Sequence, residues 1–112
     1  MNKIQCDVYW DTYQLQIIQH EYTHGWTALE FIDVTDPNEP DSFAYATVWL
    51  DVLMPGFAYL DVNNFPNIED IFKQYNLWEP AHRTRISGFV EYPLYRLNMD
   101  EIKKYEFIYL SN

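Results

Sequence analysis

The chain has 112 residues, of which 48% are hydrophobic and 19% aromatic, and its formal net charge is −10. This length and apolar content suit one packed domain, and they exclude both a second core and an intrinsically disordered chain. We therefore expect a single acidic α+β domain over residues 1–112. Phosphate groups would repel its negative charge, which argues against direct binding of nucleic acid and of anionic membranes.

The N-terminal residues and the cysteine content favour a cytoplasmic protein. Cys6 is the single cysteine, so no intramolecular disulfide is possible. Residues 1–7 lack the apolar run of a signal peptide, and no stretch approaches the roughly 18 apolar residues of a membrane span. The oligomeric state is left open.

Acidic and basic residues are segregated along the chain. The 12 acids between residues 4 and 72 occur without a Lys or Arg among them, whereas residues 73–112 hold five acids and six bases. Ordinary surfaces mix the two signs, because unbalanced like charges destabilise the compact state. The pattern indicates either selection for a basic partner or simple solubility.

The first elements are predicted to be strands. Apolar and polar residues alternate over residues 12–18, residues 27–34 are rich in β-formers, and a His-Gly pair at 24–25 supplies turn chemistry. These segments predict a β-hairpin. Residues 35–42 contain two prolines, three acids and no large apolar side chain, which predicts an exposed acidic loop.

The segment from Phe43 to Leu53 is predicted to be a central strand, because every second residue from 44 to 52 is apolar. The other parity carries three aromatic rings, those of Phe43, Tyr45 and Trp49. We expect a helix to cover these rings as part of the core. The alternative is a binding surface, a role for which Tyr and Trp are well suited.

A short strand over residues 58–62 and an Asn-Asn turn precede the clearest helix of the chain. The helix is predicted from one apolar face, formed by Ile68, Ile71, Phe72 and Tyr75. Asn67 is its predicted N-cap, with Asp70 completing a capping box.

The C-terminal third is predicted to be less regular. Residues 76–86 show no clear period, and residues 88–92 are strand-like, with Pro93 restricting them to a sheet edge or a bulge. A cap pattern at Asn98 predicts a short helix near 99–105, and the residues after it either extend this helix or form a last strand. The predicted fold class is thus α+β: a mostly antiparallel sheet of about five strands with one or two short helices packed on it.

Residues 20–24, His20-Glu21-Tyr22-Thr23-His24, match the H-E-x-x-H motif of zinc hydrolases. That chemistry requires a helix, which brings the two histidines onto one face. Here the pattern predicts a strand, in which they would lie roughly 13 Å apart at about 3.3 Å per residue, too far for two zinc bonds of about 2.1 Å. A zinc hydrolase is therefore only a remote alternative.

The sequence holds no phosphate-binding loop, no G-x-S-x-G and no C-x-x-C motif. The abundant carboxylates do not identify a general acid and base without geometry. We expect neither catalysis, nor a metal, nor a cofactor, and we favour a binding protein over an enzyme.

The segment from Tyr45 to Leu97 holds two distinctive strings, Asp61-Val62-Asn63-Asn64-Phe65-Pro66 and Ser87-Gly88-Phe89-Val90-Glu91-Tyr92-Pro93. With them the chain resembles a family of small acidic proteins of unknown function carried on bacterial mobile elements such as phages and conjugative elements. Members of that family are glycine-rich between the strings, where this chain has Trp78, His82 and Arg85. The resemblance implies no established activity, but it implies a context in which small acidic proteins often inhibit host defence, as anti-restriction and anti-CRISPR proteins do.

The leading hypothesis is an inhibitory nucleic-acid mimic whose acidic half occupies the basic groove of a nucleic-acid-processing defence enzyme. Its partner would be a basic, nucleic-acid-binding protein of a host defence system. The alternative is an accessory interaction module of a mobile element that works without mimicry. The predicted contact residues lie first on the acidic loop and its approach and second around the helix: Asp33, Asp36, Glu39 and Asp41, then Asp61, Glu69 and Asp70.

Overall fold

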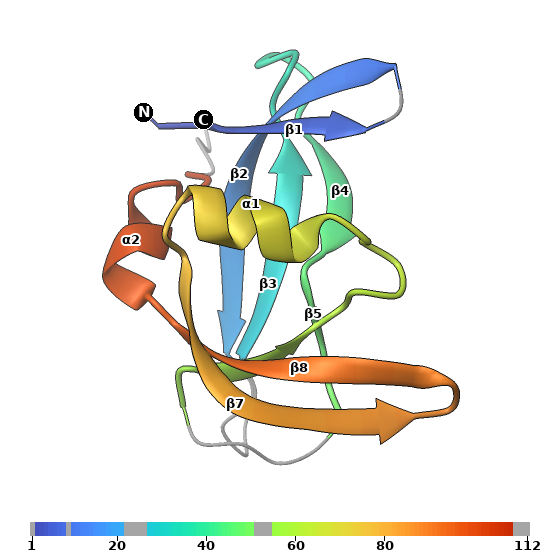
Figure 1. The fold of residues 1–112 in the computed structure, drawn as a ribbon. Coiled ribbons are helices and arrows are strands. Elements are labelled where there is room, and N and C mark those ends of the chain that lie inside the picture. Colours follow the sequence, from blue (N-terminus) through green and yellow to red (C-terminus); the bar gives the residue numbers. More distant parts are fainter. Residues whose placement is uncertain (1, 9, 22–26, 51–54, 109–112) are drawn as a thin grey trace.

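The computed structural model describes residues 2–8, 10–21, 27–50 and 55–108, which form two four-stranded sheets and two short helices (Figure 1). The strand orders are β1-β2-β3-β4 and β5-β6-β8-β7, and all neighbours are antiparallel. In chain order the elements are β1 (Ile4–Val8), β2 (Asp11–Glu21), β3 (Thr27–Asp33), β4 (Asp41–Tyr45), β5 (Thr47–Val48), β6 (Phe57–Leu60), α1 (Ile68–Gln74), β7 (Trp78–Ser87), β8 (Val90–Leu97) and α2 (Met99–Lys103). The predicted class is confirmed, but about five strands was too few.

The first sheet is built around the predicted hairpin. Strands β2 and β3 pair from Leu15 opposite Asp33 to Glu21 opposite Thr27, and the turn at 22–26 lies outside the described residues. The other edge of β2 pairs first with β1. Farther along the same edge, residues 105–107 lie beside β2 and form a single parallel bridge to Ile17. This segment is therefore neither a helical extension nor a full strand.

The predicted central strand from Phe43 to Leu53 is wrong. Strand β4 is an edge of the first sheet and β5 an edge of the second, and the chain passes between them at Ala46. The Ala46 N–H donates to the Leu29 carbonyl at 2.8 Å, and its carbonyl accepts from the Asp61 N–H at 2.9 Å. Alternation predicts a strand, but it does not distinguish one strand from two that turn a corner between sheets. Residues 51–54 lie outside the described part.

The core lies between the two sheets and α1, which crosses the face of β2 and β3 in Figure 1. The predicted apolar helix face is confirmed, because Ile68, Ile71 and Phe72 are buried. The predicted N-cap positions, Asn67 and Asn98, are confirmed, but neither side chain forms the expected capping hydrogen bond. Instead the Asn67 amide approaches the Asp7 carbonyl at 3.5 Å, and the Asn98 amide donates to the Asn76 carbonyl at 3.1 Å.

Residues 76–86, predicted to be irregular, form most of a long strand. Strand β7 pairs with β8 through a two-residue turn at Gly88-Phe89, where Gly88 has a φ of 62°. A register shift between Pro80 and Arg83 interrupts the alternation that would have identified the strand. Pro93 lies beyond the end of the β6 pairing, so that side of β8 is locally an edge, as Pro requires.

No helix in the described ranges is long and apolar enough to cross a membrane.

Candidate functional site

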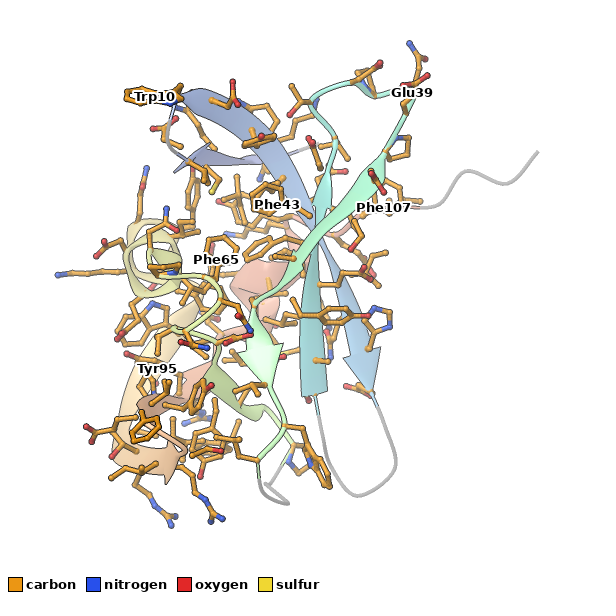
Figure 2. The ribbon with its side chains drawn as sticks, turned by 90° about the vertical axis from the view of Figure 1, so that its right-hand side faces the viewer. Trp10, Glu39, Phe43, Phe65, Tyr95 and Phe107 are labelled. Atoms are coloured by element: carbon orange, nitrogen blue, oxygen red, sulfur yellow. The ribbon has the colours of Figure 1, made fainter. Side chains whose placement is uncertain are left out.

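Six carboxylates gather at one end of the first sheet. The β1–β2 turn and the β3–β4 loop lie at the same end, because Leu15 of β2 pairs with the last residue of β3 and the Val34 N–H donates to the Gln14 carbonyl at 2.8 Å. Figure 2 shows Trp10 of the turn and Glu39 of the loop at this end. We call it the acidic end, defined by Asp7, Asp11, Asp33, Asp36, Glu39 and Asp41.

The β3–β4 loop is shaped by its own aspartates. The Asp33 carboxylate accepts hydrogen bonds from the Thr35 N–H at 2.9 Å and from its hydroxyl at 2.6 Å. The Asp36 carboxylate accepts from the Asn38 N–H at 3.0 Å. Such side-chain to backbone bonds fix a turn and leave the negative charge in place.

No base neutralises the acidic end within the described part of the chain, since the ion pairs found there involve other residues. All three arginines of the chain lie in the other sheet, Arg83 and Arg85 on β7 and Arg96 on β8. The charge segregation along the sequence is therefore also a segregation between the two sheets. At the acidic end, a basic partner would therefore face a surface whose charged side chains are all negative.

The predicted contact residues of the acidic loop lie together, whereas the second group is separated and partly used internally. Asp61, a predicted contact residue, is only 8% exposed, and its carboxylate accepts hydrogen bonds from the Asn64 N–H at 3.3 Å and from the Asn64 side-chain amide at 3.0 Å. It closes the turn before α1. The Glu69 carboxylate accepts a hydrogen bond from the Tyr95 hydroxyl, and burial together with this carboxylate raises the pKa of Tyr95. Asp70 is exposed on α1.

The first half of the H-E-x-x-H motif is extended, as predicted: His20 and Glu21 end strand β2, and His24 lies outside the described residues. The His20 Nε2 lies 3.0 Å from Glu30 Oε1, and the Ser42 hydroxyl donates to Glu30 Oε2 at 2.6 Å. The carboxylate thus stands between serine and imidazole, so the imidazole is not placed to activate the hydroxyl. The described ranges hold no group of three His, Cys, Asp or Glu side chains able to bind a metal.

Burial and hydrogen bonding act on Glu30 in opposite directions. Burial raises the pKa of this carboxyl, but the hydrogen bonds from Ser42 and His20 and the charge of His20 together outweigh it. The pKa of Glu30 is therefore lowered from its ordinary value. The group ties β4 to β2 across β3, and it carries its charge at neutral pH.

The aromatic rings predicted to share one covered face are divided. Phe43 packs against Tyr13 and Phe65 at centroid distances of 5.0 and 5.9 Å, whereas Tyr45 is 46% and Trp49 54% exposed. The expected helix cover is wrong for the latter two. The most exposed tryptophan described is Trp10, at 98%, which sequence reasoning missed because a lone ring beside a turn adds no periodic signal.

The fold and these surfaces define a small acidic α+β protein with two antiparallel sheets and no recognisable catalytic constellation in its described part. The chain belongs to the DUF4313 family, a domain of unknown function, which it matches over residues 14–109. No curated protein and no solved structure matches the chain.

Proposed function

We propose that this protein is an inhibitory binding protein of a phage or another mobile element. Its acidic end imitates the phosphates of nucleic acid and occupies the basic groove of a nucleic-acid-processing defence enzyme, of the anti-restriction or anti-CRISPR type. The observation that carries the proposal is the presence of six carboxylates at one end of a sheet, none of which forms an ion pair with a base in the described part of the chain.

The fixed placement of the charges favours mimicry over plain solubility. Duplex DNA presents one negative charge per roughly 1.7 Å of its axis, and its protein partners provide basic grooves for that array. The acidic end offers carboxylates on three strand termini and on a loop held by internal hydrogen bonds. Preorganised charges lose little conformational entropy on binding.

The mobile-element context is supported by the resemblance of the strings at 61–66 and 87–93 to small acidic proteins of such elements. In that context an inhibitor must reach its target before nucleic acid does. A surface of one sign raises association rates by about 10- to 1,000-fold at low salt.

The proposal is tested by capturing a target from a host extract, identifying it by mass spectrometry and then measuring its affinity for two charge variants. One reverses Asp36, Glu39 and Asp41 to Lys; the control reverses the exposed acids Glu91, Asp100 and Glu106, which lie outside the acidic end. Both change the net charge equally. The first variant should lose target binding while the control retains it, and added DNA or RNA should compete with the wild-type protein.

The wild-type complex should also weaken as salt rises, because the Debye length is only about 8 Å at physiological ionic strength. A target that binds the loop variant as well as the wild type, at every salt concentration and alongside saturating nucleic acid, would overturn mimicry. That result would favour an ordinary interaction module that uses the exposed rings of Tyr45 and Trp49.

A further inference from the structure

An apolar groove opens beside the acidic end. It has a volume of about 500 Å³ and lies between the end of β1, strand β4 and the turn before α1. Its apolar lining consists of Val8, Phe43, Ala44, Phe65 and Pro66, with Asp7 on its polar rim. Pockets that seat ligands have volumes of this order, with apolar walls and a few polar groups.

The floor of the groove is continuous with the core. Phe43 packs on Phe65 at 5.9 Å, and Phe65 packs on the fully buried Phe31 at 5.7 Å. These rings cannot close the groove without disturbing the core, because protein interiors are densely packed. The groove is therefore preformed in this fold, and an occupant would not first have to open it.

Charge decides what kind of occupant fits. The Asp7 carboxylate accepts the Thr12 hydroxyl at 2.7 Å, which orients it and leaves it charged. Asp11 pairs with Val8, and Asp41 precedes Phe43 by two residues on β4. Every segment that forms the groove comes from the part of the chain without Lys or Arg, so a basic occupant is attracted and an acidic one repelled.

We propose that this groove is the docking site for a basic segment of the partner protein, one that places a bulky apolar side chain between Lys or Arg residues. The inference rests on the proposed function and adds to it the place of contact and the chemistry of the contacting segment. The apolar side chain fills the groove, and the flanking cations meet Asp7 and the neighbouring carboxylates.

Three short peptides test the groove without the target: acetyl-Lys-Phe-Lys-amide, the neutral Ser-Phe-Ser form and the acidic Glu-Phe-Glu form, each titrated into the ¹⁵N-labelled full chain. The basic peptide should shift the amides of Val8, Ala44 and Asn64 and bind most tightly. The acidic peptide should bind most weakly. Equal binding of all three, or shifts confined to residues remote from the groove, would overturn the proposal.

Two pairs of variants separate shape from charge. Ala44→Trp fills the groove and should abolish the shifts, whereas Ser87→Trp adds the same ring at the β7–β8 turn and should not. Asp7→Asn keeps the shape and should weaken the basic peptide about two- to fivefold, the range of a single exposed ion pair, without affecting the neutral one. Asp100→Asn is its control and should change neither.

If the Ala44→Trp variant folds and binds the basic peptide as tightly as the wild type, the groove is not the docking site. If Ala44→Trp does not fold, the comparison of Asp7→Asn with its control Asp100→Asn tests the proposal. An equal loss of affinity for the basic and the neutral peptide in Asp7→Asn would contradict the proposed charge contact. The peptide experiments and the competition experiment test different proposals. If the groove binds the basic peptide but nucleic acid does not compete for the target, only the proposed function is contradicted.

Discussion

Asp33 at the end of β3 lies directly opposite Asp41 at the start of β4. Like charges at directly opposed positions of an antiparallel pair destabilise it, by about 0.2–1 kcal/mol. No base compensates either carboxylate within the described chain. A pair that costs stability is expected where selection acts on binding instead.

Replacing Asp41 with Asn should therefore raise the free energy of unfolding at neutral pH, by about 0.2–1 kcal/mol at low salt. The Asn oxygen can still accept the Ser42 N–H bond that Asp41 accepts at 2.9 Å. Denaturant melts at low and high salt measure the gain, which salt should diminish. Asp100→Asn is the control, because Asp100 lies in the first turn of α2 and should bring no gain. An Asp41 variant no more stable than the wild type at low salt would contradict the repulsion.

Packing should outweigh capping in α1. Ile71 is buried, so Ile71→Ala should cost about 2–5 kcal/mol. The Asn67 side chain does not cap the helix, so Asn67→Ala should stay within about 0.5 kcal/mol of the wild type rather than lose the roughly 1 kcal/mol of a true cap. Denaturant melts of both variants measure this. A loss of about 1 kcal/mol in the free energy of unfolding of Asn67→Ala would show that the Asn67 side chain caps the helix in solution.

The end of α1 depends on one left-handed residue. Asn76 has a φ of 57°, the Leu77 N–H donates to the Phe72 carbonyl at 2.8 Å, and the Asn76 N–H donates to the Lys73 carbonyl at 3.3 Å. This is the Schellman pattern of helix ends. Asn76→Ala should cost roughly 1 kcal/mol and Asn76→Gly should not, because Asn tolerates the left-handed conformation through its short polar side chain and Gly has no Cβ, whereas Ala has a Cβ and no polar group. Thermal unfolding followed by circular dichroism compares the two, and equal melting temperatures would contradict the strain.

Glu30 should contribute to the acid limb of the stability curve. Its pKa is lowered in the folded state, so its stabilising effect is complete above the ordinary value of 4.5 and is lost as pH falls through the lower folded-state pKa. Glu30→Gln should destabilise at neutral pH, and its difference from the wild type should shrink below about pH 4.5. Urea melts from pH 3 to 7 test this, and a difference independent of pH would assign the effect to packing alone.

Trp10 should matter for binding and not for folding. Its side chain is 98% exposed in the β1–β2 turn, two residues after Val8 of the groove. Trp10→Ala should leave the free energy of unfolding within about 0.5 kcal/mol of the wild type, as for other surface changes. Because tryptophan is enriched among binding hot spots, the same change should lower the affinity for the captured target at least tenfold, measured by calorimetry. An unchanged affinity would place the contact elsewhere on the acidic end.

Local sequence patterns predicted much of the secondary structure. Alternation over residues 12–18 and the β-formers of residues 27–34 identified the first hairpin, and the spacing of Ile68, Ile71 and Phe72 identified α1 with its buried face. These predictions succeed because side chains on one face repeat with the period of the local backbone. Where a bulge interrupts the period, as between Pro80 and Arg83, the strand could not be recognised.

The sequence by itself determined the α+β class, the excess of negative charge and its confinement to residues 4–72. Only the tertiary structure decided that the chain turns a corner at Ala46 into a second sheet, that Asp61 is buried, and that turn and loop carboxylates lie at the same end of a sheet beside an apolar groove. Composition and periodicity depend on neighbours along the chain, whereas these features depend on contacts between residues far apart in it. Such contacts also engage the side-chain amides of Asn67 and Asn98, which occupy the predicted N-cap positions but bond to the carbonyls of Asp7 and Asn76 and not to the helix ends.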